Sequence, residues 1–193
     1  KFLMLIGREA ENARQGKKAR IVAKMNSLCD PVIMNALYDA SKAGVKIDLT
    51  VRGICCIKAG VPGLSENISV RSIVGNYLEH SRIFYFYNDG FEDIYMGSAD
   101  WMPRNLDKRV EITFPVEDPG LKTKVKEILQ IQLADTLKAH IMQPDGSYVK
   151  QDLRGKTRLD SQMYFVKKAQ AGQEIDGEAE NTRVFIPIES RIL

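Results

Sequence analysis

Two segments of the sequence place cationic and titratable side chains at the end or the start of a strand-like run. Arg52 follows a segment that alternates as a strand and precedes a glycine. Ligand contacts in α/β sheets gather at the carboxyl ends of parallel strands, so Arg52 is a candidate phosphate ligand. His80 and Arg82 open another strand two residues apart, on one face. An imidazole beside a guanidinium can hold a phosphate and transfer a proton near neutral pH.

A third segment runs from Tyr95 to Arg109. Its small residues let backbone N–H groups approach a ligand, and the only tryptophan, Trp101, is followed by cations at Arg104, Lys108 and Arg109. This composition suits a nucleotide or a phosphate better than an apolar ligand. Each segment also has a structural interpretation. Arg52 would then form a salt bridge, His80 would be a structural histidine, and the third segment would be a solvated basic loop with a structural tryptophan.

Hydrophobic periodicity predicts the elements that position these residues. Residues 19–51 read as a β-α-β unit with parallel strands, and Asp30-Pro31 is a typical helix start. Asn88-Asp-Gly90 predicts a hairpin turn. His140 is expected just after the last turn of a long helix, in a structural role. The predicted fold class is α/β, a mixed sheet flanked by helices. Its helices are expected over residues 1–16, 31–43 and 121–140, and its strands over residues 19–25, 46–51, 69–74, 82–87, 93–96 and 109–114.

Composition narrows the function classes. The chain has 193 residues, of which 44% are hydrophobic and 27% charged, as in an ordinary globular protein. No apolar run approaches the roughly 18 residues of a membrane span. The net charge of +3 is too mild to indicate nucleic acid, and two histidines cannot build a His-rich metal site. The three cysteines are expected to be buried free thiols. The first residue is not methionine, so we expect a fragment or a processed product.

The order of a histidine, a strand and Gly97-Ser-x-Asp100 resembles half of the pattern of the phospholipase D superfamily, His-x-Lys followed by Gly-Ser-x-Asn. Enzymes of that superfamily pair two such halves and use one histidine as a nucleophile on phosphorus. Two features depart from the pattern. Arg82 replaces the lysine, and Tyr87 stands where the pattern has an acidic residue.

Longer strings give a narrower resemblance, to the C-terminal domain of polyphosphate kinase, in order over about residues 1–165. The most specific of them is Gly97-Ser-Ala-Asp-Trp-Met-Pro-Arg-Asn-Leu-Asp107. The others include Ala23-Lys-Met-Asn-Ser-Leu28, Val51-Arg-Gly-Ile-Cys55, Gly60-Val-Pro-Gly-Leu-Ser-Glu-Asn-Ile68 and Leu78-Glu-His-Ser-Arg-Ile-Phe84. The resemblance implies a phospholipase D-like domain over residues 1–168. Residues 169–193 are expected to form a flexible connector and tail, because residues 170–182 are polar and rich in glycine.

The resemblance also implies an activity, the reversible transfer of the terminal phosphoryl group of ATP to polyphosphate. The phosphorylated histidine of the family lies in a preceding domain that is not part of this sequence. Arg52 and His80 match family positions that contact the nucleotide phosphates. His80 would be the second, assisting histidine and the catalytic residue of this domain. Arg82, Arg104 and Arg109 are further candidate ATP and phosphate contacts, because phosphoryl transfer needs charge neutralisation.

The expected partners are ATP or ADP, inorganic polyphosphate, the preceding part of the same enzyme and further copies of it. Mg²⁺ is expected with ATP, without clear ligands in this segment, and the expected location is the cytoplasm or its membrane face. Two other interpretations stay open at this point. The chain could be half of a phospholipase D-superfamily phosphodiesterase or nuclease, or a non-catalytic module that binds nucleotides or phosphate, and the isolated chain is expected to be inactive.

Overall fold

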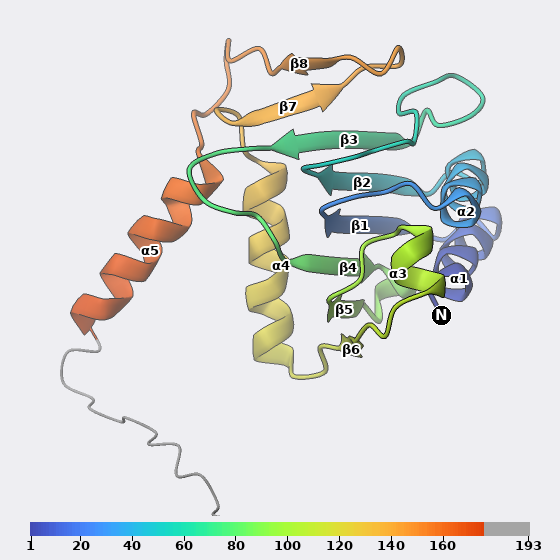
Figure 1. Ribbon diagram of the computed structural model, residues 1–193, viewed down its shortest axis with the longest axis horizontal. Coiled ribbons are helices and arrows are strands. Elements are labelled where there is room, and N and C mark those ends of the chain that lie inside the picture. Colours follow the sequence, from blue (N-terminus) through green and yellow to red (C-terminus); the bar gives the residue numbers. More distant parts are fainter. Residues whose placement is uncertain (176–193) are drawn as a thin grey trace, which may run out of the picture. The chain divides into compact units, whose positions relative to one another are not determined.

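A computed structural model describes residues 1–175 and contains one eight-stranded mixed sheet flanked by helices (Figure 1). The strands follow the order β6-β5-β4-β1-β2-β3-β7-β8. They are β1 (Arg20–Met25), β2 (Lys46–Val51), β3 (Ile68–Ile73), β4 (Arg82–Phe86), β5 (Asp93–Gly97), β6 (Thr113–Pro115), β7 (Ala139–Met142) and β8 (Tyr148–Lys150). The helices are α1 (Phe2–Arg14), α2 (Pro31–Lys42), α3 (Pro103–Asp107), α4 (Pro119–Leu133) and α5 (Ser161–Ile175), with a 3-10 turn η1 (Asn88–Gly90). The predicted fold class is confirmed.

The β-α-β unit at the centre of the sheet is also confirmed. β1 and β2 pair in parallel, with Arg20 opposite Lys46 and Met25 opposite Val51. Helix α2 begins where the sequence predicts, because the Asp30 side chain accepts a hydrogen bond of 2.8 Å from the Ile33 N–H. β3 extends the parallel part of the sheet, so three parallel strands end at one edge. That edge carries Arg52.

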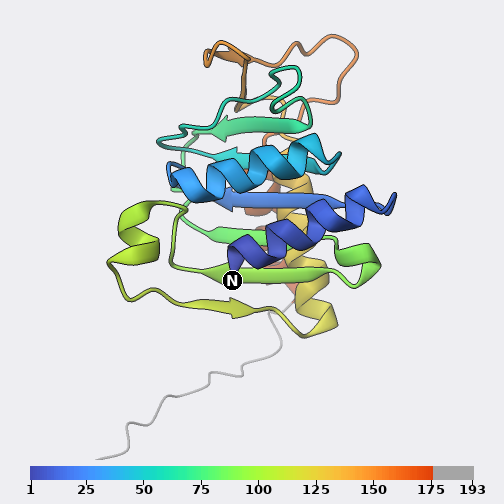
Figure 2. The same cartoon turned by 90° about the vertical axis from the view of Figure 1, so that its right-hand side faces the viewer.

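Helices α1 and α2 cover one face of the sheet and α4 covers the other (Figure 2). The larger core lies under α1 and α2, where alternate residues of β1, β2 and β4 point, among them Ile21, Leu49 and Phe84. The smaller core lies under α4 and contains Val22 and Tyr85. The strict alternation along each central strand therefore divides the buried residues between two layers.

The long helix ends earlier than predicted, and the cause is Asp135. Its buried carboxylate accepts backbone N–H bonds from Lys138 and Ala139 through one oxygen, and from Ser161 through the other. These bonds turn the chain out of the helix, so α4 stops at Leu133 and residues 139–142 form β7 instead of helix. The expectation of a helix over residues 121–140 is wrong beyond Leu133. His140 lies on a strand between β3 and β8.

The strand expected over residues 109–114 is shorter than predicted. Only Thr113–Pro115 pair with β5, as β6. The preceding residues turn toward Ser98 instead, because the Ile112 N–H donates to its hydroxyl and the Glu111 carboxylate accepts from it. Val110 is fully exposed. The hairpin turn after β4 is confirmed, since η1 joins the antiparallel strands β4 and β5.

The three cysteines are free thiols, but the expected burial is wrong for Cys56, which is exposed, and only partial for the other two. Cys29 and Cys55 are half-buried, and desolvation raises the pKa of Cys55 to about 11.

The chain forms two compact units, residues 1–162 and 163–193. In the second unit, residues 163–175 continue helix α5, so part of the expected connector is helical. The remainder of the expected connector and the tail, in which the sequence of residues 184–188 would suit a last strand, lie outside the described residues. Among residues 1–175, no helix is long and apolar enough to cross a membrane.

Candidate functional site

The carboxyl ends of β1 and β2 and the start of β4 meet at one edge of the sheet, where a hydrogen-bonded chain of side chains forms. Arg52 follows β2 and donates from Nε to Asn26 Oδ1 at 2.7 Å. Asn26 follows β1 and donates to Asp100 through its backbone N–H at 2.8 Å and its amide at 3.3 Å. Asp100 in turn accepts from Arg82. Residues from four separate segments thus share one site, since Asp100 follows β5.

Asp100 lies at the centre of this series of hydrogen-bonded side chains. It is 5% exposed and binds the Arg82 guanidinium through two bonds, Nε to Oδ1 at 3.1 Å and Nη2 to Oδ2 at 3.2 Å. A bidentate pair of this kind fixes the orientation of both side chains. The third nitrogen of Arg82, Nη1, donates to the His80 carbonyl at 2.8 Å and lies 3.2 Å from His80 Nε2. Arg82 therefore holds His80 in place.

Arg52 and His80 both keep polar groups that a ligand could contact in this arrangement. In the described part of the chain, the Arg52 guanidinium makes its hydrogen bond through Nε alone, so both terminal NH₂ groups remain available for a ligand. The His80 ring is exposed at the same edge. Arg82 differs, because each of its nitrogen atoms has a protein partner. The geometry gives Arg82 a positioning role beside its predicted phosphate contact.

The position after Arg52 requires glycine for a steric reason. A Cβ atom at Gly53 would lie 2.8 Å from the Asn26 carbonyl oxygen, which accepts the Gly53 N–H. The Arg-Gly pair thus lets the end of β2 approach the end of β1 closely enough for Arg52 to reach Asn26.

The buried lysine of β1 supports the segment that carries His80. Lys24 is 1% exposed and donates from Nζ to the Ser81 hydroxyl at 2.9 Å and to the Ser81 carbonyl at 3.1 Å. Its ammonium also lies 3.3 Å from Glu79 Oε2. Desolvation lowers the pKa of Lys24, although Glu79 opposes that shift. Two glutamines, Gln132 and Gln162, donate to the same carboxylate at 2.8 and 3.0 Å.

The third predicted segment contributes less than its composition suggests. Trp101 is fully buried and stacks on Phe84 at 5.1 Å between ring centroids, so it belongs to the core and its structural interpretation is correct. The Ser98 N–H bonds the Ile112 carbonyl at 3.0 Å and is not available to a ligand. Arg104 and Arg109 are exposed, and the hydrogen-bonded chain contains neither. Their predicted phosphate contacts stay predictions.

Sequence reasoning missed three residues of this edge. Asn26 and Lys24 lie in the string Ala23–Leu28, but nothing in their spacing marks them as site residues. Asp100 appears only as the last residue of Gly97-Ser-x-Asp100. A polar residue directly after β1, beside a cation at the end of the parallel strand β2, is the signal that could have found Asn26. In residues 1–175, no three His, Cys, Asp or Glu side chains are grouped to hold a metal ion. Mg²⁺ therefore stays an expectation that comes with ATP.

Fold and site together define an α/β domain in which Arg52, His80 and Arg82 meet at the edge where the parallel strands end. Residues 1–162 match the model of the family "Polyphosphate kinase C-terminal domain 2", and the chain belongs to this family. It is 55% identical over 161 residues to a polyphosphate kinase of Burkholderia ambifaria, a match over 83% of this chain and 23% of that protein. It is 57% identical over 146 residues to a polyphosphate kinase of Thermosynechococcus vestitus, a match over 76% and 20%.

A solved structure of a polyphosphate kinase is similar to this chain as well. The crystal structure of the polyphosphate kinase from Porphyromonas gingivalis matches with a TM-score of 0.85 and 41% identity, over 90% of this chain and 27% of that one. The chain thus spans about a quarter of the length of the relatives it matches.

Proposed function

We propose that this chain is the C-terminal catalytic domain of an ATP-polyphosphate phosphotransferase and that it binds the nucleotide phosphates at Arg52 and His80. The observation that carries the proposal is the open guanidinium of Arg52, held by Asn26 on the same hydrogen-bonded chain as the exposed His80. A guanidinium with two free NH₂ groups matches two phosphate oxygens. The membership of the chain in the polyphosphate kinase family supports the substrate class.

In the proposed reaction, the bond between the terminal phosphorus of ATP and its bridging oxygen breaks, and ADP leaves. A histidine of a preceding domain accepts the phosphoryl group through a new P–N bond and then passes it to a polyphosphate end. Arg52 neutralises charge that develops on the phosphates. His80, oriented by Arg82, stabilises the transferred group or moves a proton. Mg²⁺ would accompany the nucleotide.

The remaining parts of the proposal concern the complete enzyme. Inorganic polyphosphate and ATP or ADP are its substrates, and we expect it to act as an oligomer in the cytoplasm. A preceding domain is required because this chain does not itself hold the phosphorylated histidine. Arg104 and Arg109, exposed on the neighbouring segment, would contact the distal part of the bound phosphate chain.

Labelling with γ-³²P ATP tests the proposal. The complete polyphosphate kinase that contains this chain should form acid-labile phosphohistidine and polyphosphate, whereas the 193-residue chain alone should form neither. Labelling of the isolated chain at His80 would contradict the division of roles. Hydrolysis of a phosphodiester by the complete protein would favour the phosphodiesterase interpretation, and nucleotide binding without transfer would favour a non-catalytic module.

A further inference from the structure

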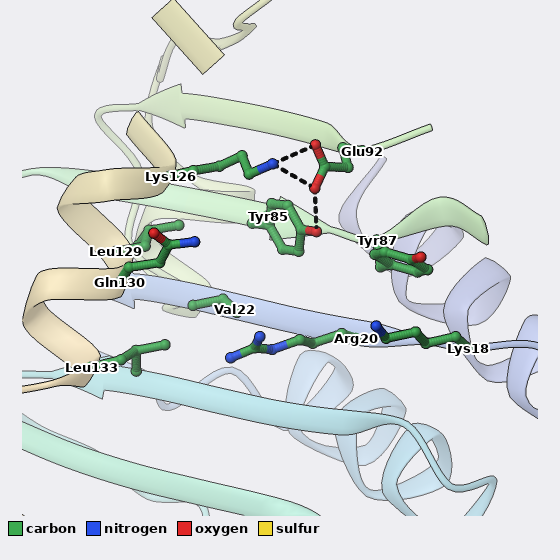
Figure 3. A pocket seen from close by; sticks show the side chains of 10 residues that line it. All are labelled: Lys18, Arg20, Val22, Tyr85, Tyr87, Glu92, Lys126, Leu129, Gln130 and Leu133. Atoms are coloured by element: carbon green, nitrogen blue, oxygen red, sulfur yellow. Dashed lines mark hydrogen bonds and ion pairs between the residues drawn. The ribbon is translucent and has the colours of Figure 1, made fainter. Parts of the chain in front are cut away.

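A pocket lies between α4 and the sheet, at the amino end of β1 (Figure 3). Arg52 and His80 lie near the carboxyl end of that strand, where Arg52 contacts Asn26 and Lys24 contacts Ser81. Its volume is about 250 Å³. That is slightly below the volumes of about 300 to 1,000 Å³ that hold drug-sized ligands, so it suits a small molecule. None of the residues of the candidate phosphate site lines it.

Among the described residues that line this pocket, Glu92 is the only carboxylate, and it already accepts three hydrogen bonds. It accepts from Lys126 Nζ at 2.7 and 2.8 Å and from the Tyr85 hydroxyl at 2.9 Å, as the dashed lines in Figure 3 show. Burial alone would raise the pKa of Glu92, but these hydrogen bonds outweigh it and lower the pKa. Desolvation raises the pKa of Tyr85 in turn, so its hydroxyl stays a donor to Glu92. The pocket therefore offers a ligand few acceptors.

Donors, in contrast, are left over. Arg20 uses Nε and Nη2 on one oxygen of Asp48, at 3.2 and 2.8 Å, and no described residue accepts a bond from its Nη1. Lys18 Nζ lies 5.2 Å from the centre of the Tyr87 ring and has no carboxylate partner in the described part of the chain. The Gln130 side chain also makes no hydrogen bond to a described residue. Figure 3 shows these three side chains around one opening.

The floor and one wall of the pocket are apolar. Val22 and Leu129 are buried beneath it, and the rings of Tyr85 and Tyr87 stand beside it. A bare polyanion such as polyphosphate could use the donors but would leave this apolar surface without a partner. An apolar ligand could cover the floor but would leave the donors unpaired.

We propose that this pocket binds a small organic anion, a phosphate or carboxylate joined to one aromatic ring or a short apolar body. The anion would lie between Lys18, Arg20 Nη1 and Gln130, and the ring would lie over Val22 and Leu129 beside the two tyrosines. The ligand chemistry of the pocket is independent of the phosphotransfer proposed above, because the two share no residue.

Phenyl phosphate is a suitable probe because it carries both parts. Its binding to the 193-residue chain can be followed by two-dimensional amide NMR and by calorimetry, with inorganic phosphate as the comparison. We expect a dissociation constant of about 1 mM or tighter for phenyl phosphate. Inorganic phosphate should bind roughly tenfold more weakly, because it cannot cover the apolar floor. The perturbed amides should include those of Val22, Tyr85 and Gln130.

Lys18→Glu should weaken phenyl phosphate binding about tenfold, since it replaces an attractive charge with a repulsive one near the anion. Lys124→Glu is the matched control, because Lys124 is exposed on the side of α4 that faces away from the pocket and the change in net charge is the same. Gln130→Ala, at the exposed mouth, is a second test if Lys18→Glu disturbs folding. Equal binding of the two phosphates, equal losses in the Lys18 and Lys124 variants, or no perturbation near Tyr85 would each overturn the proposal.

Discussion

At the carboxyl end of β1, one buried carboxylate connects three of the predicted phosphate-site residues, Arg52, His80 and Arg82, whereas at the amino end Asp48 and Glu92 each pair with a separate cation. Asp100 binds Asn26 and Arg82, and through them it is connected to Arg52 and His80. At the other end, Arg20 pairs with Asp48 and Lys126 pairs with Glu92. A shared carboxylate couples its partners, while separate pairs act locally.

The comparison leads to different expectations for the two ends. Substitutions at the carboxyl end should lower kcat even when the replaced side chain does not itself contact the ligand. Substitutions at the amino end should change local stability and leave turnover nearly unchanged.

Arg52→Ala should give the largest effect. In the complete protein, its removal should lower the kcat of the proposed phosphotransfer by about 10²-fold or more, because a donor to developing charge is typically worth that much. His80→Ala should cost a similar factor if it moves a proton. The measurement is the rate of polyphosphate synthesis at saturating ATP.

Lys18→Ala is the control for this prediction, since it removes a cation that precedes β1, at the opposite edge of the parallel strands from Arg52. Its kcat should stay within about twofold of the parent, as expected for an exposed charge far from the reaction. Comparable losses in the Arg52 and Lys18 variants would mean that overall charge, rather than the hydrogen-bonded edge, determines the rate.

Lys24→Met should give an intermediate effect on activity. Without the bonds from Nζ to Ser81, the segment that carries His80 is less constrained, so kcat should fall about tenfold with a smaller change in the KM for ATP. Stability should fall by about 1 to 3 kcal/mol, because Glu79 and the Ser81 carbonyl lose a buried donor, while the cost of burying the ammonium group is removed. The two measurements are steady-state kinetics and urea unfolding.

Lys126→Met provides the comparison for Lys24→Met, because it also removes one lysine of an ion pair but at the amino end. It should leave kcat unchanged. A Lys24 variant with normal kcat, or one that loses activity only in proportion to a large loss of folded protein, would contradict the positioning role.

Glu92→Gln should have a smaller effect, limited to stability. The lowered pKa of Glu92 means that the native state favours its carboxylate form. This stabilisation is complete above the unfolded pKa, near 4.5, and is lost as the pH falls through the folded pKa. Because Glu92 and Lys126 are partly exposed, we expect the variant to lose about 0.5 to 1 kcal/mol at neutral pH.

Urea unfolding of parent and variant, from neutral pH to below the folded pKa of Glu92, measures the difference in their free energies of unfolding. It should be largest at neutral pH and shrink toward zero in acid. A difference that is the same at both ends of the range would show that the ion pair contributes nothing and that the substitution acts through packing.

The central part of the fold could be predicted because its signals are local. Alternation along β1 and β2, the Asp30 cap and the turn after β4 depend on neighbours in the sequence. The end of α4 could not, because Asp135 stops the helix through bonds to Ser161, 26 positions further along the chain. No periodicity within the helix shows that contact.

The residues of the candidate site also fall into two groups, those that a local sequence pattern predicts and those that only the fold reveals. Arg52 and His80 were found because each lies at the end or the start of a recognisable strand. The Asn26–Asp100 bond joins residues 74 positions apart, so no local pattern could show that Asp100 holds the site together. Trp101 was ambiguous for the same reason, since only the fold shows that it packs against Phe84 in the core.

The smallest expected effect concerns His140, whose predicted position was wrong but whose predicted structural role is still untested. It lies on β7, opposite Ser72 of β3, and its Nδ1 lies 3.1 Å from the Lys138 carbonyl. β7 is two strands away from β2, which corresponds to about 10 Å across the sheet. A glutamine can donate to the same carbonyl, so His140→Gln in the complete enzyme should keep kcat within about twofold, measured beside Arg52→Ala. A loss above roughly tenfold, or 1.4 kcal/mol of barrier, would show that the functional edge extends past β3 and that the comparison of two ends is too simple.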